Sequence, residues 1–188
     1  LLKEYKKPRD KITKLLAAGD IIRVKKGLYV FGEDWRRTPI SSEVLANLIY
    51  GPSYISKEYA LAYYGVIPER VYQVTSMTTG RTKSFSTPLG MFTYEHLSIN
   101  RYSLGLTLIP IDDERSVFFA TKEKALADSI HGEVQLTTID QMVEHLEDNL
   151  RIERSLIQNF DQDLLSAITE KYHSPVIRLL NSAIKGLS

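Results

Sequence analysis

Strand-length segments separated by turn residues fill the middle of the chain, from residue 71 to residue 120. Gly80 and Arg81 mark one turn, and Pro88-Leu89-Gly90 marks the next. Turns this close together join neighbouring strands as hairpins, so most of these strands should pair antiparallel. The expected strands are residues 71–79, 83–87, 91–97, 106–109 and 117–120.

Segments with helical periodicity lie on both sides of this strand-rich region. Ser56 and Thr121 stand where helix N-caps are expected, and Gly19 and Gly65 stand where helices should end. With 43% hydrophobic and 25% charged residues, the chain has the composition of a globular protein. The predicted fold class is α+β, with a mostly antiparallel sheet and packed helices. The expected helices are residues 8–18, 42–50, 57–64, 122–132, 139–149, 162–172 and 175–185.

The net charge of +1 conceals a gradient along the sequence. Residues 1–37 contain eleven Lys or Arg and five Asp or Glu, which gives +6. Residues 112–188 contain eight basic and fourteen acidic side chains, which gives −6. A basic head on a neutral-to-acidic body favours a polyanionic partner over a merely solvated surface.

The head has the local pattern of a helix followed by a basic hairpin. Ile12, Leu15 and Leu16 form the apolar stripe of the helix, and the hairpin strands 21–24 and 28–31 flank a tip of Lys25, Lys26 and Gly27. This is the order of the last helix and the wing in a winged helix-turn-helix domain, where the helix enters the major groove and the wing follows the backbone. The alternative is a solvated amphipathic helix and hairpin. The expected DNA-contacting residues are Lys7, Arg9, Lys11, Thr13, Lys14, Arg23, Lys25 and Lys26.

Side chains that could support catalysis form no convincing site in the sequence. Asp112, Asp113 and Glu114 could bind Mg²⁺ in a nuclease, but with Arg115 adjacent they are better interpreted as a hairpin turn. The chain has no cysteine, and its four histidines lack metal-ligand spacing. We therefore expect no catalytic residue, no metal and no cofactor. The residues Arg81 and Lys83 form a basic turn that could add a nucleic-acid contact.

Several ordered motifs resemble the AbiEi family of bacterial antitoxins and transcriptional regulators. They are GDIIRVKKGLYVF, PSYIS, ALAYYGVIPE, TSMTTGR, TPLGMFTY and ATKEKALAD, and they span roughly residues 5–132. Lys122 stands where the family pattern has proline, and residues 139–188 match only loosely. The resemblance implies a winged-helix domain that represses its own operon and a C-terminal domain that counteracts a nucleotidyltransferase-type toxin without a stable complex.

The resulting prediction has two domains. Residues 1–37 are expected to be a winged-helix DNA-binding domain that is incomplete at its N-terminus, because too few residues precede the first helix. Residues 38–188 are expected to be the antitoxin domain. The expected partners are operator DNA and the toxin as a functional antagonist, in the cytoplasm and without a membrane, since no run of about 18 apolar residues occurs. The alternatives are a metal-dependent nuclease and a protein-interaction module that sequesters the toxin.

Overall fold

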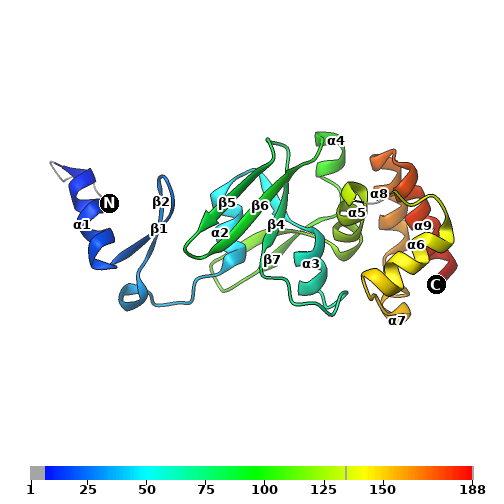
Figure 1. Ribbon diagram of the computed structural model, residues 1–188, viewed down its shortest axis with the longest axis horizontal. Coiled ribbons are helices and arrows are strands. Elements are labelled where there is room, and N and C mark those ends of the chain that lie inside the picture. The colour runs from blue at the N-terminus through cyan, green and yellow to red at the C-terminus, as the bar shows by residue number, and fades with distance from the viewer. Residues whose placement is uncertain (1–6, 134, 188) are drawn as a thin grey trace.

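The computed structural model describes residues 7–133 and 135–187, and it has three parts along an elongated molecule (Figure 1). A small head lies at one end, a six-stranded sheet with its helices occupies the middle, and the last helices form the other end. The mixture of helices and sheets confirms the α+β class. The first six residues of the predicted head lie outside the described residues.

The head consists of α1 (Pro8–Ala18) and a hairpin of β1 (Ile21–Lys25) and β2 (Leu28–Phe31). Pro8 begins the helix, where its missing N–H is not needed, and Gly19 ends it with a positive φ of 78°. The predicted order of helix and hairpin is confirmed. The winged helix-turn-helix is not confirmed, because α1 is the only α-helix within described residues 7–37 and the motif needs more than one.

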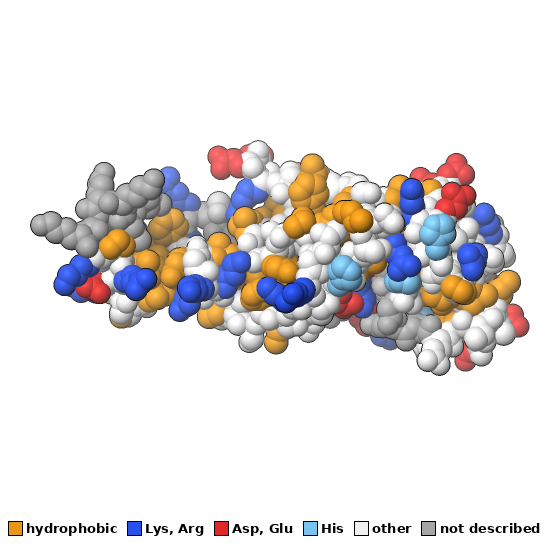
Figure 2. Space-filling view, turned by 90° about the horizontal axis from the view of Figure 1, so that it is seen from above, with side chains coloured by type: hydrophobic (Ala, Val, Ile, Leu, Met, Phe, Trp, Pro, Cys, Tyr) orange, Lys and Arg blue, Asp and Glu red, His pale blue; other side chains and the backbone are white. Residues whose placement is uncertain are grey.

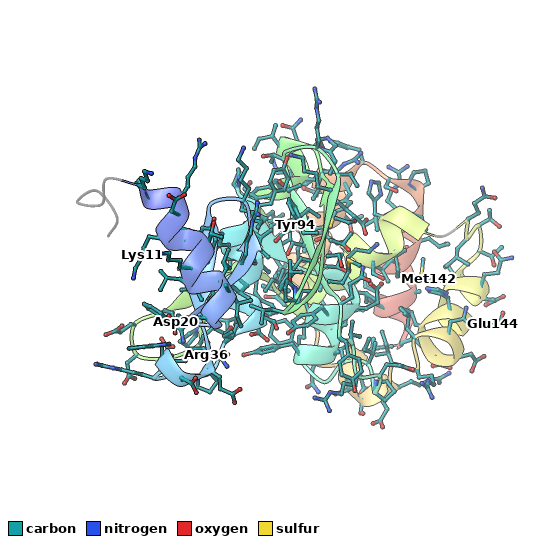
Figure 3. All side chains as sticks on the ribbon, turned by 60° about the vertical axis from the view of Figure 1, so that its left-hand side comes forward. Lys11, Asp20, Arg36, Tyr94, Met142 and Glu144 are labelled. Carbon is teal, nitrogen blue, oxygen red and sulfur yellow. The ribbon has the colours of Figure 1, made fainter. Side chains whose placement is uncertain are left out.

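The base of the head is closed by a hydrogen bond between the loop after α1 and the turn after β2. The indole Nε1 of Trp35 donates to Oδ1 of Asp20 at 2.8 Å. Figure 3 shows Asp20 and Arg36 at this base, on the side where the chain leaves the head. The linker toward the body therefore starts from a fixed point of the hairpin.

The central sheet has the strand order β5-β6-β4-β3-β8-β7. Its two outer hairpins, β5–β6 and β7–β8, are antiparallel, as is the central pair β3–β4. The pairs β4–β6 and β3–β8 are parallel, so the sheet is mixed and the expectation of a mostly antiparallel sheet needs this correction. The strands are β3 (Ser53–Ile55), β4 (Val74–Thr78), β5 (Lys83–Thr87), β6 (Gly90–His96), β7 (Leu106–Pro110) and β8 (Ser116–Ala120).

Helices cover the sheet and are tied to it by specific bonds. The helix α2 (Ser42–Ile49) is capped by Ser41, whose Oγ accepts from the N–H of Val44 at 3.1 Å. The Tyr94 hydroxyl on β6 donates to the Ala46 carbonyl of α2 at 2.6 Å, and Figure 3 shows Tyr94 inside the body. The other helices of this part are α3 (Lys57–Tyr63), α4 (Ile99–Tyr102) and α5 (Lys122–Glu133).

The C-terminal part is helical and well packed. Thr138 starts it with a capping box in which Gln141 is the reciprocal partner, and Asp161 caps the next long helix. None of the described helices is long and apolar enough to cross a membrane. The elements are α6 (Ile139–Glu144), the π-helical turn η2 (His145–Asn149), α7 (Arg154–Ile157), α8 (Gln162–Tyr172) and α9 (Pro175–Leu187).

Candidate nucleic-acid interface

The outer surface of α1 carries most of the predicted DNA-contacting residues of the helix. Ile12, Leu15 and Leu16 are half-buried, as their spacing predicts, so the opposite surface of α1 faces solvent. Lys11 differs from the expectation because it is half-buried rather than exposed. The Thr13 hydroxyl donates to the Arg9 carbonyl at 3.1 Å, which leaves its oxygen free to accept. The exposed predicted residues of this segment are Lys7, Arg9, Thr13 and Lys14.

The hairpin tip is formed by Lys26 and Gly27, and Gly27 has a positive φ of 86°. A left-handed conformation is available to glycine without strain, so the tight turn can expose the lysine beside it. Arg23 and Lys26 are exposed. Lys25 instead belongs to β1 and is half-buried, and its Nζ donates to the carbonyl oxygen of Ile49 at the end of α2. The structure therefore places Lys25 against the body and not at the tip.

The predicted basic turn of the body lies next to this hairpin. The N–H of Arg81 donates to the Tyr50 hydroxyl at 3.1 Å, and Lys83 Nζ lies 4.6 Å from the centroid of the Tyr50 ring. Tyr50 directly follows Ile49, the residue that receives Lys25. The structure thus brings together a basic hairpin and a basic turn that are more than fifty residues apart in the sequence, a separation at which sequence patterns give no guide to proximity.

The arrangement produces a basic row along one face of the molecule. Figure 2 shows Lys and Arg side chains following one another from the head to the middle of the molecule, whereas at the C-terminal end Asp and Glu side chains lie beside Lys and Arg. Clustered cations of this kind attract phosphate groups and release condensed counterions when they bind. The row has the sign of charge suited to a nucleic-acid backbone. The exposed basic residues of the hairpin and of the turn in the body are Arg23, Lys26, Arg81 and Lys83.

The acidic residues 112–114 form the turn between β7 and β8. Asp112 Oδ1 accepts from the N–H groups of Glu114 and Arg115, and Arg115 Nε donates to Asp112 Oδ2 at 2.7 Å. The hydrogen bond from Arg115 lowers the pKa of Asp112, and both carboxylate oxygens accept hydrogen bonds within the turn. This geometry agrees with the interpretation as a hairpin turn. Within residues 7–133 and 135–187, no three His, Asp or Glu side chains are grouped so that they could hold a metal ion.

A fully buried polar cluster, which the sequence reasoning missed, joins the sheet to the C-terminal helices. Its centre is an ion pair on α5, with Lys124 Nζ 3.2 Å from Asp128 Oδ1 and both side chains inaccessible. The Tyr54 hydroxyl on β3 donates to Asp128 Oδ2 at 2.9 Å, and the Tyr172 hydroxyl on α8 donates to Oδ1. Lys124 also donates to Tyr172 and to the Arg101 carbonyl at 2.6 Å. Every member is therefore satisfied by a partner from another element.

Burial controls the ionisation of this cluster. Burial, reinforced by the charge of Asp128, raises the pKa values of Tyr54 and Tyr172 far above the ordinary tyrosine range. Burial lowers the pKa of Lys124, while Asp128 acts in the opposite direction. The cluster has no opening to solvent that would admit a substrate, since Tyr54, Lys124, Asp128 and Tyr172 are all at most 2% exposed. We therefore assign it to stability.

Ser56 has a different role from the one expected. It occupies the N-cap position of α3, but its side chain makes no capping bond to that helix. Its hydroxyl donates to Asp128 Oδ2 at 2.7 Å, so the side chain is directed toward the buried carboxylate and not toward the N–H groups of the helix. The prediction that the Ser56 side chain caps the helix is therefore wrong, and Ser56 belongs to the buried cluster.

The signal for this cluster was present in the sequence but weak. Lys124 and Asp128 lie four residues apart among apolar residues of the segment KEKALADSI. Pairs at this spacing usually lie on exposed helix faces, and the segment also contains Lys122, Glu123 and Ser129, so its pattern did not indicate burial. The chain matches no model of a known protein family, and no curated protein matches it significantly.

Proposed function

We propose that the chain is a DNA-binding transcriptional regulator whose head and sheet edge contact one duplex. The observation that carries the proposal is the junction at Ile49 and Tyr50, which joins the hairpin to the turn of Arg81 and Lys83. Long cations on a continuous surface suit phosphate contacts. On α1, Arg9 has the donors and Thr13 has the free acceptor oxygen that contacts with base edges require. The resemblance to the AbiEi family supports operator DNA of its own operon as the target.

The salt dependence of DNA binding tests this proposal. The probe is the DNA upstream of the gene, with mobility shifts recorded at several salt concentrations. Lys26→Ala and Arg81→Ala should each reduce the slope of log K against log salt by about one, as expected for one lost phosphate contact. Lys185→Ala is the matched control, since Lys185 is an exposed lysine on α9 at the other end of the molecule. Equal slopes for all three variants would remove the basic row from the interface.

We further propose, on the resemblance alone, that the body counteracts a nucleotidyltransferase-type toxin. Such a toxin acts on nucleotides or RNA, and an antagonist that forms no complex with it can engage the same polyanionic target. Arg81 and Lys83 are then the candidate residues, since both are exposed. Replacing both with Ala should reduce the rescue of toxin-expressing cells, whereas Lys26→Ala should leave rescue intact.

Size-exclusion chromatography of the mixed proteins separates this mechanism from its alternative. Separate elution of toxin and antitoxin supports antagonism without a stable complex. Co-elution at micromolar concentration would instead favour a module that sequesters the toxin. Undiminished rescue by the double variant would exclude the turn of Arg81 and Lys83 from either mechanism.

A further inference from the structure

Lys25 occupies a position that phosphate contact does not explain. It is the last residue of β1, is half-buried, and donates its ammonium group to the carbonyl of Ile49. Ile49 is the last residue of α2, where carbonyl groups lack partners within the helix and carry the negative end of its dipole. The same ammonium lies 5.9 Å from the centroid of the Phe85 ring on β5. Lys25 is therefore held by the body from two sides.

The residue next to its acceptor holds the basic turn of the body. Tyr50 accepts from the N–H of Arg81 through its hydroxyl, and its ring lies 4.6 Å from Lys83 Nζ. The Phe85 ring, which faces Lys25, also lies 6.2 Å from the Tyr50 ring. The basic hairpin and the basic turn thus contact two consecutive residues of the body, Ile49 and Tyr50.

The other contacts between head and body differ in kind. Leu28 and Val30 are half-buried and pack against the core, and Val24 is the only fully buried apolar side chain among described residues 7–37. Apolar burial is not directional, whereas a charged hydrogen bond fixes an orientation. The bond from Lys25 is consequently the contact that can set the angle of the hairpin.

We propose that Lys25 is a positioning residue that aligns the cations of the head with Arg81 and Lys83 as one surface. The inference rests on the proposed DNA-binding function. A surface that is aligned before binding loses less conformational freedom on DNA than two patches joined by a loose linker. Removing Lys25 should therefore weaken the contribution of residues that it does not touch.

A double-mutant cycle on promoter DNA tests this coupling. Lys25→Met keeps the apolar stem but removes the ammonium group, and Lys26→Met is the matched loss of charge at the exposed neighbour. In the parent chain, Arg81→Ala with Lys83→Ala should weaken binding strongly; in the Lys25→Met background, the same pair should have an effect smaller by about tenfold. In the Lys26→Met background the double change at Arg81 and Lys83 should weaken binding as much as in the parent chain. In the Lys25→Arg background, where a cation is again present, it should also have its full effect. Equal effects in all backgrounds would overturn the positioning role.

A readout without DNA keeps the two proposals distinguishable. The chain has no cysteine, so Lys14→Cys on α1 and Ser84→Cys on β5 place two spin labels at exposed sites of head and body. The distance distribution between them should broaden in Lys25→Met and stay narrow in Lys26→Met and Lys25→Arg. Broadening in a chain that binds no DNA would support the positioning role and defeat the proposed function. An unchanged distribution in Lys25→Met would overturn the positioning role whatever the DNA result.

Discussion

The head and the C-terminal helices are attached to opposite ends of the same body, and a lysine takes part in each attachment (Figure 1). Lys25 makes its bond from a half-buried position at the edge of the sheet. Lys124 makes its bonds from complete burial, with Asp128 as counter-ion and Tyr172 as the link to α8. One attachment is a single polar contact, and the other is a closed network.

The surroundings of the two lysines differ as much as their bonds. In the described head, Val24 alone among apolar side chains is fully buried, whereas α6 to α9 contribute a series of buried aliphatic and aromatic residues to the core. A polar contact in a buried site is costly to break, because the group that loses its partner cannot form a hydrogen bond with water instead. We therefore expect the C-terminal helices to be an integral part of the fold, and the contacts that orient the head to contribute little to global stability.

The largest loss of unfolding free energy is expected from Asp128→Ala, which breaks the attachment of the C-terminal helices. The change leaves the Lys124 charge unpaired in the core and removes the acceptor of Tyr54, Ser56 and Tyr172. Removing one partner of a buried ion pair costs about 3–5 kcal/mol of unfolding free energy. Urea denaturation measures the loss, and Asp113→Ala, in the exposed turn after β7, is the control that should stay within about 0.5 kcal/mol. A loss below that of an ordinary surface change would contradict the closed network.

Alkaline pH should weaken the same attachment. Tyr54 and Tyr172 have pKa values raised by burial and by Asp128, so the folded chain keeps these protons above pH 10, where the unfolded chain loses them. Unfolding then releases protons, and each retained proton lowers the unfolding free energy by about 1.4 kcal/mol per pH unit above about 10. Lys124, whose pKa is lowered by burial, acts with the opposite sign, but its contribution stops growing above about pH 10.4.

Ultraviolet titration can check this pH dependence. Phenolate absorbance from Tyr54 and Tyr172 should develop only as the chain unfolds, together with the loss of helical circular dichroism. Phenolate formation by all tyrosines near pH 10 in a folded chain would show that the cluster is open to solvent. That result would remove the difference between the two ends of the molecule.

A smaller effect is expected from Tyr172→Phe, which deletes one hydroxyl and keeps the ring. The hydroxyl accepts from Lys124 and donates to Asp128, so both partners lose a bond in a site without water access. The expected loss is about 1–3 kcal/mol of unfolding free energy, the usual cost of an abandoned buried polar group. Tyr72→Phe is the matched control, since Tyr72 is 77% exposed. Equal stability of the two variants would mean that α8 is attached by apolar packing alone.

Turn and cap residues in the sequence were sufficient to predict the bounds of the helices and strands beside them. The strand 83–87 and the helix 162–172 have the predicted bounds, because a glycine turn, a proline turn and the Asp161 cap lie within a few residues of them. The strand β3 was missed because it is only three residues long and buried on both faces, so it has no alternation to detect. Without β3 the parallel pair β3–β8 could not be anticipated, and the parallel pair β4–β6 was missed because β6 pairs with both β5 and β4.

The basic residues of the candidate site could be predicted from the sequence, but their proximity in the fold could not. The charge of the head and the turn of Arg81 and Lys83 are local features of the sequence. Their proximity depends on Tyr50, which is 31 residues from Arg81, and on Ile49, which is 24 residues from Lys25. The buried cluster needs still longer contacts, with Tyr54 and Tyr172 at 74 and 44 residues from Asp128. Spacing within one segment cannot reveal partners at such distances.

The smallest expected effect on stability, from Lys25→Met, is the sharpest test of the comparison. A cation at a helix C-terminus contributes about 0.3–1 kcal/mol, so the free energy of global unfolding should fall by no more than this. Amide hydrogen exchange should nevertheless accelerate in β1 and β2, because the hairpin loses its directional contact with α2, while exchange in α8 and α9 stays unchanged. Tyr172→Phe should show the reverse pattern, with faster exchange in α8 and no change in the hairpin. A loss from Lys25→Met as large as that from Asp128→Ala, with exchange accelerated along the whole chain, would show that the head is as integral to the fold as the C-terminal helices.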